Sequence, residues 1–150
     1  GCGEAVQHQG AGYSDILTIA AKQSGARAFE MAGVEHSDID LAMIYDSFTI
    51  TVLATLENLG FCPVGEGGNF VSNGGIALGG TLPVNPDGGG LSSNHPGMRG
   101  IFLVIEAVKQ LRDECDARQV PKAEVALAHG TGGTIGDKHS GATLILGVDR

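Results

Sequence analysis

The sequence predicts a single layered α/β domain. Apolar residues recur at helical spacing in three segments, and strand-length apolar runs lie between and after them. The resulting order is helix, strand, helix, glycine-rich loop, helix, strand, strand, which is typical of a sheet packed against helices. With 150 residues, the chain is long enough for one buried core and too short for two.

The first predicted helix spans residues 14–33. Its apolar positions share one face, and Ser14 or Asp15 is the expected N-cap. Gly33 is well placed to end the helix, because glycine adopts the left-handed conformation of a C-terminal cap at little cost.

A buried strand and a second helix follow. Residues 41–45 form a continuous apolar run of strand length, which indicates a strand buried on both faces of a sheet. Asp46 or Ser47 is the expected cap of the second helix, and Gly60 is its expected end. The side chains expected on its buried face are Phe48, Val52, Leu53, Leu56 and Leu59.

Residues 62–97 are rich in glycine and proline and predict a shaped loop with at most short strands. A third helix is predicted over residues 97–112. Residues 125–128 and 142–147 are predicted core strands, joined by a glycine-rich loop over residues 130–136. The buried stripe expected on the third helix is Ile101, Phe102, Ile105, Val108 and Leu111.

Composition narrows the classes of partner. The net charge of −8, from 9 Lys and Arg against 17 Asp and Glu, would repel a nucleic acid. No apolar run approaches the roughly 20 residues that a membrane span needs. Cys2, Cys62 and Cys115 lack the paired spacing of a zinc or redox motif, so no metal site is expected. We expect them to be small buried apolar residues in a reducing, cytoplasmic compartment.

The start of the sequence reads like a chain entered partway, since it has no methionine and no capping or turn residues ahead of Cys2. We therefore expect residues 1–13 to be a partial segment or linker from a preceding region, and residues 14–150 to form the domain.

The first candidate site is the predicted strand-to-helix junction at Tyr45 and Asp46. In α/β folds, ligands bind at the ends of buried strands. Tyr45 is a candidate catalytic residue, as a proton donor or as a hydrogen-bond partner of a carbonyl group. Asp46 is a candidate substrate-binding residue, with helix capping as the alternative.

The second candidate site lies just ahead of the third predicted helix, where Asn94 and His95 precede Pro96. The free N–H groups of a helix start favour a neutral imidazole, which can act as a base or as an acceptor. The surrounding loop is more elaborate than packing requires. We therefore predict that His95 is catalytic and that Asn94 binds substrate.

The third candidate site begins at His129. Backbone N–H groups in a glycine-rich loop can hold an anion or an oxyanion. His129 is accordingly a candidate catalytic residue, and the candidate substrate-binding residues are Gly130, Gly132 and Gly133.

The other charged and histidine side chains have simpler expected roles. His8, His36 and His139 are expected to face solvent. Arg99 and Lys138 either supply positive charge for an anionic substrate or are solvated surface charges.

Taken in order, these segments resemble the C-terminal half of a thiolase, especially the sterol-carrier-protein type and its bacterial and archaeal relatives. The similarity runs from about Leu17 to Gly147. Tyr45-Asp46-Ser47-Phe48 matches the motif Asn-Glu-Ala-Phe or His-Asp-Cys-Phe, Asn94-His95-Pro96 matches Gly-His-Pro, and the stretch from His129 corresponds to Cys-x-Gly. The resemblance implies a layered mixed sheet with helices on both faces.

Roles carried over from the family come with two departures. The histidine of Gly-His-Pro, here His95, activates the nucleophilic cysteine and helps to form the oxyanion hole. Tyr45 replaces an Asn or His that helps to bind the acyl oxygen or a water, and the residues from His129 replace the second catalytic cysteine. The nucleophilic cysteine of a thiolase lies in its N-terminal half, so this chain alone is expected to be inert.

The resemblance implies an acyl-coenzyme A acyltransferase, which forms carbon–carbon bonds or thiolyses a 3-oxoacyl thioester. Coenzyme A thioesters are its implied substrates, and no permanently bound cofactor is expected. One alternative is an aldolase-type lyase that cleaves a β-hydroxyacyl thioester beside a small OB-fold partner. Another is a non-catalytic acyl-coenzyme A-binding or scaffold subunit. The expected partners are an N-terminal thiolase half and further copies in a homo-oligomer.

Overall fold

The sheet is mixed and has four strands. The computed structural model describes residues 1–8, 15–133 and 138–148. The strand order is β1-β4-β3-β2, in which β4 runs antiparallel to β1 and β3, and β2 runs parallel to β3. The strands are β1 Cys2–His8, β2 Leu41–Ile44, β3 Val125–Gly133 and β4 Lys138–Gly147.

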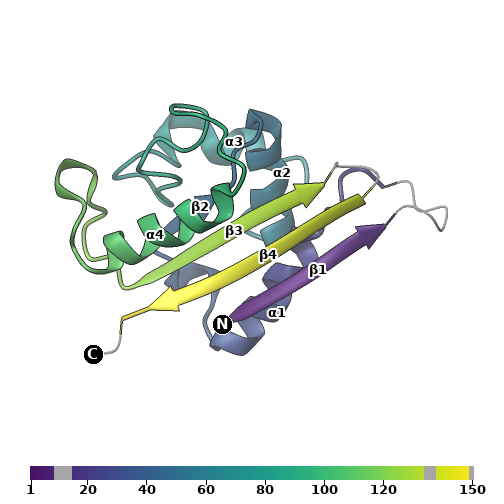
Figure 1. Cartoon of the computed structure of the whole chain (residues 1–150), viewed down its shortest axis with the longest axis horizontal. Coiled ribbons are helices and arrows are strands. Elements are labelled where there is room, and N and C mark those ends of the chain that lie inside the picture. Colours follow the sequence, from purple (N-terminus) through teal and green to yellow (C-terminus); the bar gives the residue numbers. More distant parts are fainter. Residues whose placement is uncertain (9–14, 134–137, 149–150) are drawn as a thin grey trace.

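Helices cover both faces of this sheet. α4 lies across the front in Figure 1, and α1 lies behind β4 and β1. None of the helices in the described part of the chain is long and apolar enough to cross a membrane. The helices are α1 Ala21–Ala32, α2 Thr49–Leu59, α3 Gly67–Val71 and α4 Arg99–Leu111.

The strand β2 joins the two hydrophobic cores, as its continuous apolar run predicts. All four of its side chains are buried. Leu41 and Met43 pack in the core under α4, while Ala42 and Ile44 pack in the core under α1 and α2. Because successive side chains of a strand point to opposite faces, a strand between two helical layers must be apolar at every position.

The ends of the first two helices are confirmed, but their beginnings are not. Gly33 and Gly60 adopt the left-handed conformation of the expected caps. α1 begins only at Ala21, because Asp15 instead accepts from the N–H of Leu17 (2.9 Å) and the hydroxyl of Thr18 (2.6 Å) in the preceding turn. The alternative cap, Ser14, lies outside the described residues.

The second helix also begins later than expected. α2 starts at Thr49, and neither Asp46 nor Ser47 caps it. Phe48, expected in the core, is exposed.

The buried face of α4 was predicted wrongly. Ile101, Phe102 and Ile105 are 54%, 45% and 49% exposed. The face toward the sheet instead carries Leu103 and Ala107, which lie in the core. Two buried polar side chains beside them have partners: Glu106 binds Arg118, and Gln110 binds backbone groups of the following turn. The apolar spacing therefore marked a face of α4 that this chain leaves uncovered.

The strands β3 and β4 are longer than predicted. Residues 130–133, expected in a loop, pair with residues 139–142 of β4. Residues 2–8 form the edge strand β1, which the sequence analysis did not predict. The expected domain boundary between residues 13 and 14 lies outside the described residues.

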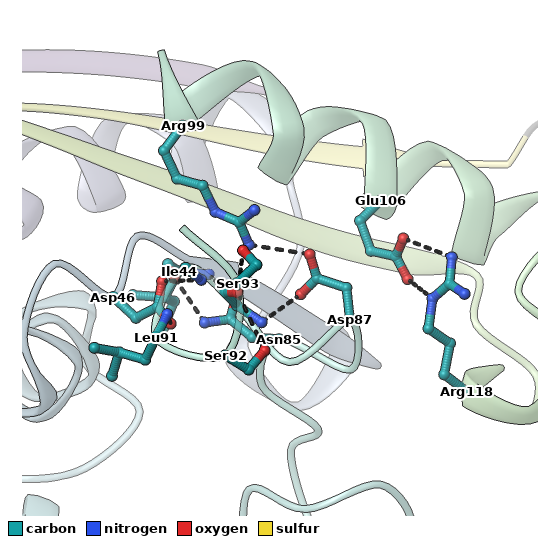
Figure 2. Close-up of polar contacts among 12 residues, drawn as sticks. Ile44, Asp46, Asn85, Asp87, Leu91, Ser92, Ser93, Arg99, Glu106 and Arg118 are labelled. Carbon is teal, nitrogen blue, oxygen red and sulfur yellow. Dashed lines mark hydrogen bonds and ion pairs between the residues drawn. The ribbon is translucent and has the colours of Figure 1, made fainter. Parts of the chain in front are cut away.

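The glycine-rich segment 62–97 contains the short helix α3 and then runs along the free edge of β2. Val84 forms a parallel bridge with Ala42. The side chain of Asn85 then holds both backbone groups of Ile44, accepting from its N–H and donating to its carbonyl oxygen at 2.8 Å each (Figure 2). This one amide thus substitutes for a strand neighbour at the end of β2.

Replacing Asn85 should lower the free energy of unfolding by more than its left-handed backbone conformation explains. Asn85→Ala is expected to lower the free energy of unfolding by about 3 kcal/mol, through two lost hydrogen bonds and a left-handed backbone. Asn73→Ala is the matched control, since Asn73 is exposed and has a similar positive φ (57° against 49°). It should lose only about 1 kcal/mol. Urea unfolding of both variants measures the difference. Equal losses would show that the side chain of Asn85 does not support the end of β2.

Candidate functional site

The site is built around the end of β2. Tyr45 follows the last residue of the strand, and its N–H donates to the carbonyl of His129 at 2.9 Å. Beyond this point β2 leaves the sheet, whereas β3 continues to Gly133. Tyr45 therefore lies at a step in the sheet, where β3 extends beyond the end of β2.

Asp46 anchors the loop that carries the histidine of the second candidate site. Its buried carboxylate accepts from the N–H of Gly90 at 2.8 Å and of Leu91 at 3.0 Å (Figure 2). A Cβ at Gly89 would collide with the same carboxylate, and Gly89 also has a positive φ of 69°. Asp46 is thus a positioning residue of the loop, and the helix-capping alternative is wrong.

An ion pair closes the base of this loop. Arg99, at the start of α4, contacts Asp87 at 3.0 Å, and Asp87 also accepts from the N–H of Gly89 at 2.9 Å. Arg99 is only 7% exposed, so it is not a solvated surface charge. The loop from Asp87 to Arg99 is held at its base by this pair and along its length by Asp46.

Tyr45 and His95 come together at the mouth of the loop. The hydroxyl oxygen of Tyr45 lies 2.8 Å from Nδ1 and 3.1 Å from Nε2 of His95. The two rings stack at a centroid distance of 5.7 Å and an angle of 28°. A phenol and an imidazole in this contact can exchange a proton. His95 is exposed, so the pair is accessible to a ligand.

A hollow of about 550 Å³ opens beside this pair. It brings together side chains from the first two candidate sites with the end of β3. The lining residues are Tyr45, Ser47, Phe48, His95, Thr131, Gly132 and Gly133. A hollow of this size can accept the acyl part of a ligand.

Thr131 contributes a backbone group that sequence reasoning missed. The carbonyls of Val125 and His129 point toward β2, where they accept from Asp40 and Tyr45. Backbone direction alternates along a strand, so the N–H and C=O of Thr131 point the same way, past the end of β2. The sequence did not reveal this group because the glycines of residues 130–133 predicted a loop there, whereas β3 continues to Gly133.

His129 does not line this hollow. It is fully buried, its Nδ1 lies 2.8 Å from the hydroxyl of Thr143, and Thr143 contacts Ser24 at 2.9 Å. Its Nε2 has no partner among the described residues. Burial lowers the pKa of His129 to about 4, and the neighbouring His139 adds to the effect.

The remaining predicted site residues divide between the hollow and its surroundings. Gly132 and Gly133 line it, while Asn94 is exposed in the loop and Gly130 faces α4. No cluster of three or more potential metal ligands occurs within the described residues. Of the cysteines, Cys62 and Cys115 are buried, as predicted, but Cys2 is exposed.

The histidines expected to face solvent differ from one another. His139 is buried, at 4% exposure, so that prediction was wrong. His36 is exposed but packs on Phe29 at a ring distance of 4.1 Å. The side chains of His8 and Lys138 lie outside the described part.

A larger hollow, of about 730 Å³, lies at the opposite edge of the sheet beside β1. Its charged side chains include Arg27, whose guanidinium donates to the carbonyl of Glu4 at 2.7 Å. None of the described residues that line it is a tyrosine or a histidine. The hollow at Tyr45 is therefore the better candidate for proton-transfer chemistry.

Comparisons with known proteins agree with the predicted resemblance. The family model described as thiolase C-terminal domain-like matches residues 3–148. An acetyl-CoA acetyltransferase of Methanothermobacter thermautotrophicus is 44% identical over 124 residues, which cover 81% of this chain and 32% of that protein. Sterol carrier protein 2 of Bos taurus is 42% identical over 118 residues, covering 77% and 22%.

An aldolase sequence and a solved aldolase structure match more of the chain. A steroid side-chain-cleaving aldolase of Thermomonospora curvata is 36% identical over 153 residues, covering 95% of this chain and 37% of that protein. The solved structure of the Ltp2-ChsH2(DUF35) aldolase matches all of this chain and 39% of its own, with a TM-score of 0.83 and 32% identity. The chain thus spans well under half the length of these relatives.

The burial of His129 makes stability depend on pH. The pKa of His129 is about 4 in the folded chain against about 6.5 when unfolded, so between these values only the unfolded chain is protonated. The stability that the neutral ring of His129 contributes to the fold is therefore complete above about pH 6.5. As the pH falls toward about 4, the free energy of unfolding decreases by roughly 3 kcal/mol for this reason.

The variant His129→Asn keeps an amide near Thr143 but cannot titrate. Its urea midpoint should fall less than that of the wild type between about pH 7 and about pH 4.5. Carboxylates titrate equally in both proteins and cancel in the comparison. Parallel curves would show that His129 is not held neutral by the fold.

Proposed function

The chain belongs to the family of thiolase C-terminal-like domains, and from this we propose that it carries the proton-transfer half of a site for carbon–carbon bond chemistry on coenzyme A thioesters. The contact between Tyr45 and His95 supports this most directly. Two residues 50 positions apart place a phenol and an imidazole at 2.8 Å beside an open hollow. Proton transfer at a carbon or oxygen near a thioester needs such a pair.

Retro-aldol cleavage is the reaction that this geometry favours. In it, the Tyr45–His95 pair takes the proton from the hydroxyl of a β-hydroxyacyl thioester. The bond between the α- and β-carbons breaks, the β-carbon becomes a carbonyl, and the electron pair forms the thioester enolate. The enolate then takes up a proton at its α-carbon. No thiolate is required, and none of the described residues lining the hollow is a cysteine.

The backbone of Thr131 has a natural role in this scheme. Its N–H points past the end of β2 into the hollow, where the thioester oxygen would gain negative charge. A fixed N–H donor at that position stabilises the enolate, and removal of one such donor typically costs about 100-fold or more in rate.

Thiolase-type acyl transfer is the second candidate. His95 keeps the His-Pro pair of the family motif Gly-His-Pro, with Asn94 at the position of the glycine, and the archaeal acetyltransferase is 44% identical. In this reaction His95 would activate a cysteine supplied by a preceding half of the protein. The chain alone would then be inert, since a histidine without the nucleophile cannot form the acyl-enzyme.

The uncovered face of α4 is the proposed contact surface for that preceding half. Ile101, Phe102 and Ile105 form an exposed apolar face, of a kind that usually marks an interaction surface. The chain makes up 32% of the archaeal acetyltransferase and 37% of the aldolase, so the relatives hold ample sequence to cover it. Because another side of α4 already packs on the sheet, this apolar face is available to pack against a further part of the same protein.

The other proposed partners are inferred from the relatives. The aldolase structure includes a DUF35 protein, and we propose a small OB-fold partner of that kind for this chain if it acts as an aldolase. A homo-oligomer and a cytoplasmic location remain predictions from the sequence and the resemblance.

Tyr45→Phe tests the proposed function in the chain joined to its preceding half. With a β-hydroxyacyl-coenzyme A and no free coenzyme A, the wild type should release a shorter thioester and a carbonyl compound. The variant should lose about 100-fold or more of kcat, because the hydroxyl can no longer pass the proton. Thr49→Val, outside the hollow and on an exposed helix position, is the control.

The substrate distinguishes the two reactions. Turnover of a 3-oxoacyl thioester only when free coenzyme A is added would identify acyl transfer, whereas cleavage without it would identify the aldolase. Thioester binding with neither reaction would overturn the catalytic proposal and leave the chain as a binding subunit.

Ile105→Asp tests the contact surface. A buried unpaired carboxylate is costly, so this variant should weaken association with the separately produced preceding half by about 10-fold or more. Val64→Asp is the control, because Val64 is 62% exposed on a different segment. Titration calorimetry measures both, and equal affinities would place the interface elsewhere.

A further inference from the structure

His139 is a buried histidine at the other end of the site, and neither the family motifs nor the Tyr45–His95 pair accounts for it. It lies on β4 and is 4% exposed. Its Nδ1 accepts the N–H of Ala20 at 3.3 Å. Ala20 immediately precedes α1, so this contact joins β4 to the start of the helix.

This contact fixes the tautomer. A nitrogen that accepts an N–H carries no proton itself, so the proton of the neutral ring resides on Nε2. Burial lowers the pKa of His139, which favours the neutral ring. The nearby start of α1 acts in the same direction, because a helix N-terminus disfavours positive charge.

The side chain of His139 adjoins the candidate site. His139 lines a hollow of about 290 Å³ that meets the hollow at Tyr45. The two hollows share Ser47, Phe48, Thr131 and Gly133. Among the described residues only Nδ1 of this ring has a hydrogen-bond partner, so Nε2 is the nitrogen left for a ligand in the hollow.

We propose that His139 is a substrate-binding residue whose Nε2–H donates a hydrogen bond to the thioester oxygen of a coenzyme A substrate, across the end of β3 from Tyr45 and His95. The proposal rests on the proposed function. In the retro-aldol step, Tyr45 and His95 handle the proton of the β-hydroxyl group. His139 and the N–H of Thr131 then hold the oxygen on which the enolate charge develops. A neutral imidazole suits this task, because it donates strongly without surrendering its proton.

A matched pair of variants separates this role from the contact with Ala20. His139→Asn keeps an oxygen near the position of Nδ1 and can still accept from Ala20, but it has no donor at the position of Nε2. His139→Gln reaches that position with an amide N–H, but it leaves the Ala20 N–H without an acceptor. The two variants therefore remove the two functions of the ring one at a time.

The experiment uses the chain joined to its preceding half, with the same β-hydroxyacyl-coenzyme A. His139→Asn should keep a melting temperature near that of the wild type and lose about 100-fold in kcat/KM. His139→Gln should melt earlier and retain kcat/KM within about 10-fold. His36→Asn, at an exposed histidine away from the hollow, should change neither kcat/KM nor substrate binding.

The outcomes distinguish this inference from the proposed function. Wild-type kcat/KM in His139→Asn, while Tyr45→Phe is inactive, would overturn the role of His139 alone. A kcat/KM that follows melting temperature across both variants would show a purely structural histidine. A proton on Nδ1, seen in the nitrogen NMR shifts of the ring, would also overturn it. A wild-type protein that neither binds nor converts the thioester would overturn the proposed function and this inference together.

Discussion

The carboxylate of Asp46 is the constraint on which the site depends. Its two oxygens accept the N–H groups of Gly90 and Leu91, and through them they fix a loop that begins some 40 residues later in the chain. Glycine is required beside it, because a side chain at Gly89 would displace the carboxylate. The loop is thereby held at the end of β2, with His95 against Tyr45. A buried carboxylate with two backbone donors is a stable arrangement, since each N–H bond to a charged acceptor contributes about 1.5–3 kcal/mol.

Features that depend on neighbours in the sequence were predictable, and features that depend on distant partners were not. The apolar run of β2 and the glycines that end α1 and α2 carry local signals, and the structure agrees with them. Tyr45 and His95 were singled out separately, and the fold brings them together. The role of Asp46, by contrast, depends on glycines far along the chain, so the local capping pattern was misleading.

The errors on α4 and at His139 share a cause. The helix α4 carries apolar residues on more than one side, and the sequence cannot say which side meets its own sheet. Here Leu103 and Ala107 are buried, together with Glu106 and Gln110, which pair with groups beyond the helix. The side with Ile101, Phe102 and Ile105 stays outside. His139 looked like a surface histidine because Ala20, which donates to its ring, lies 119 residues away. The step at the end of β2, which exposes Thr131, likewise appears only when both strand lengths are known.

The central claim is that Asp46 places His95 against Tyr45, and amide hydrogen exchange in Asp46→Asn tests it most directly. The account predicts that the backbone amides of Gly90 and Leu91 exchange at least about 10-fold faster in this variant. It also predicts that the NMR signals of the His95 ring no longer change when Tyr45 is replaced by phenylalanine. Asp15→Asn is the control, because Asp15 also accepts a backbone N–H, at 2.9 Å, but away from the site. Unchanged exchange at Gly90 and Leu91, with His95 still coupled to Tyr45, would contradict the account.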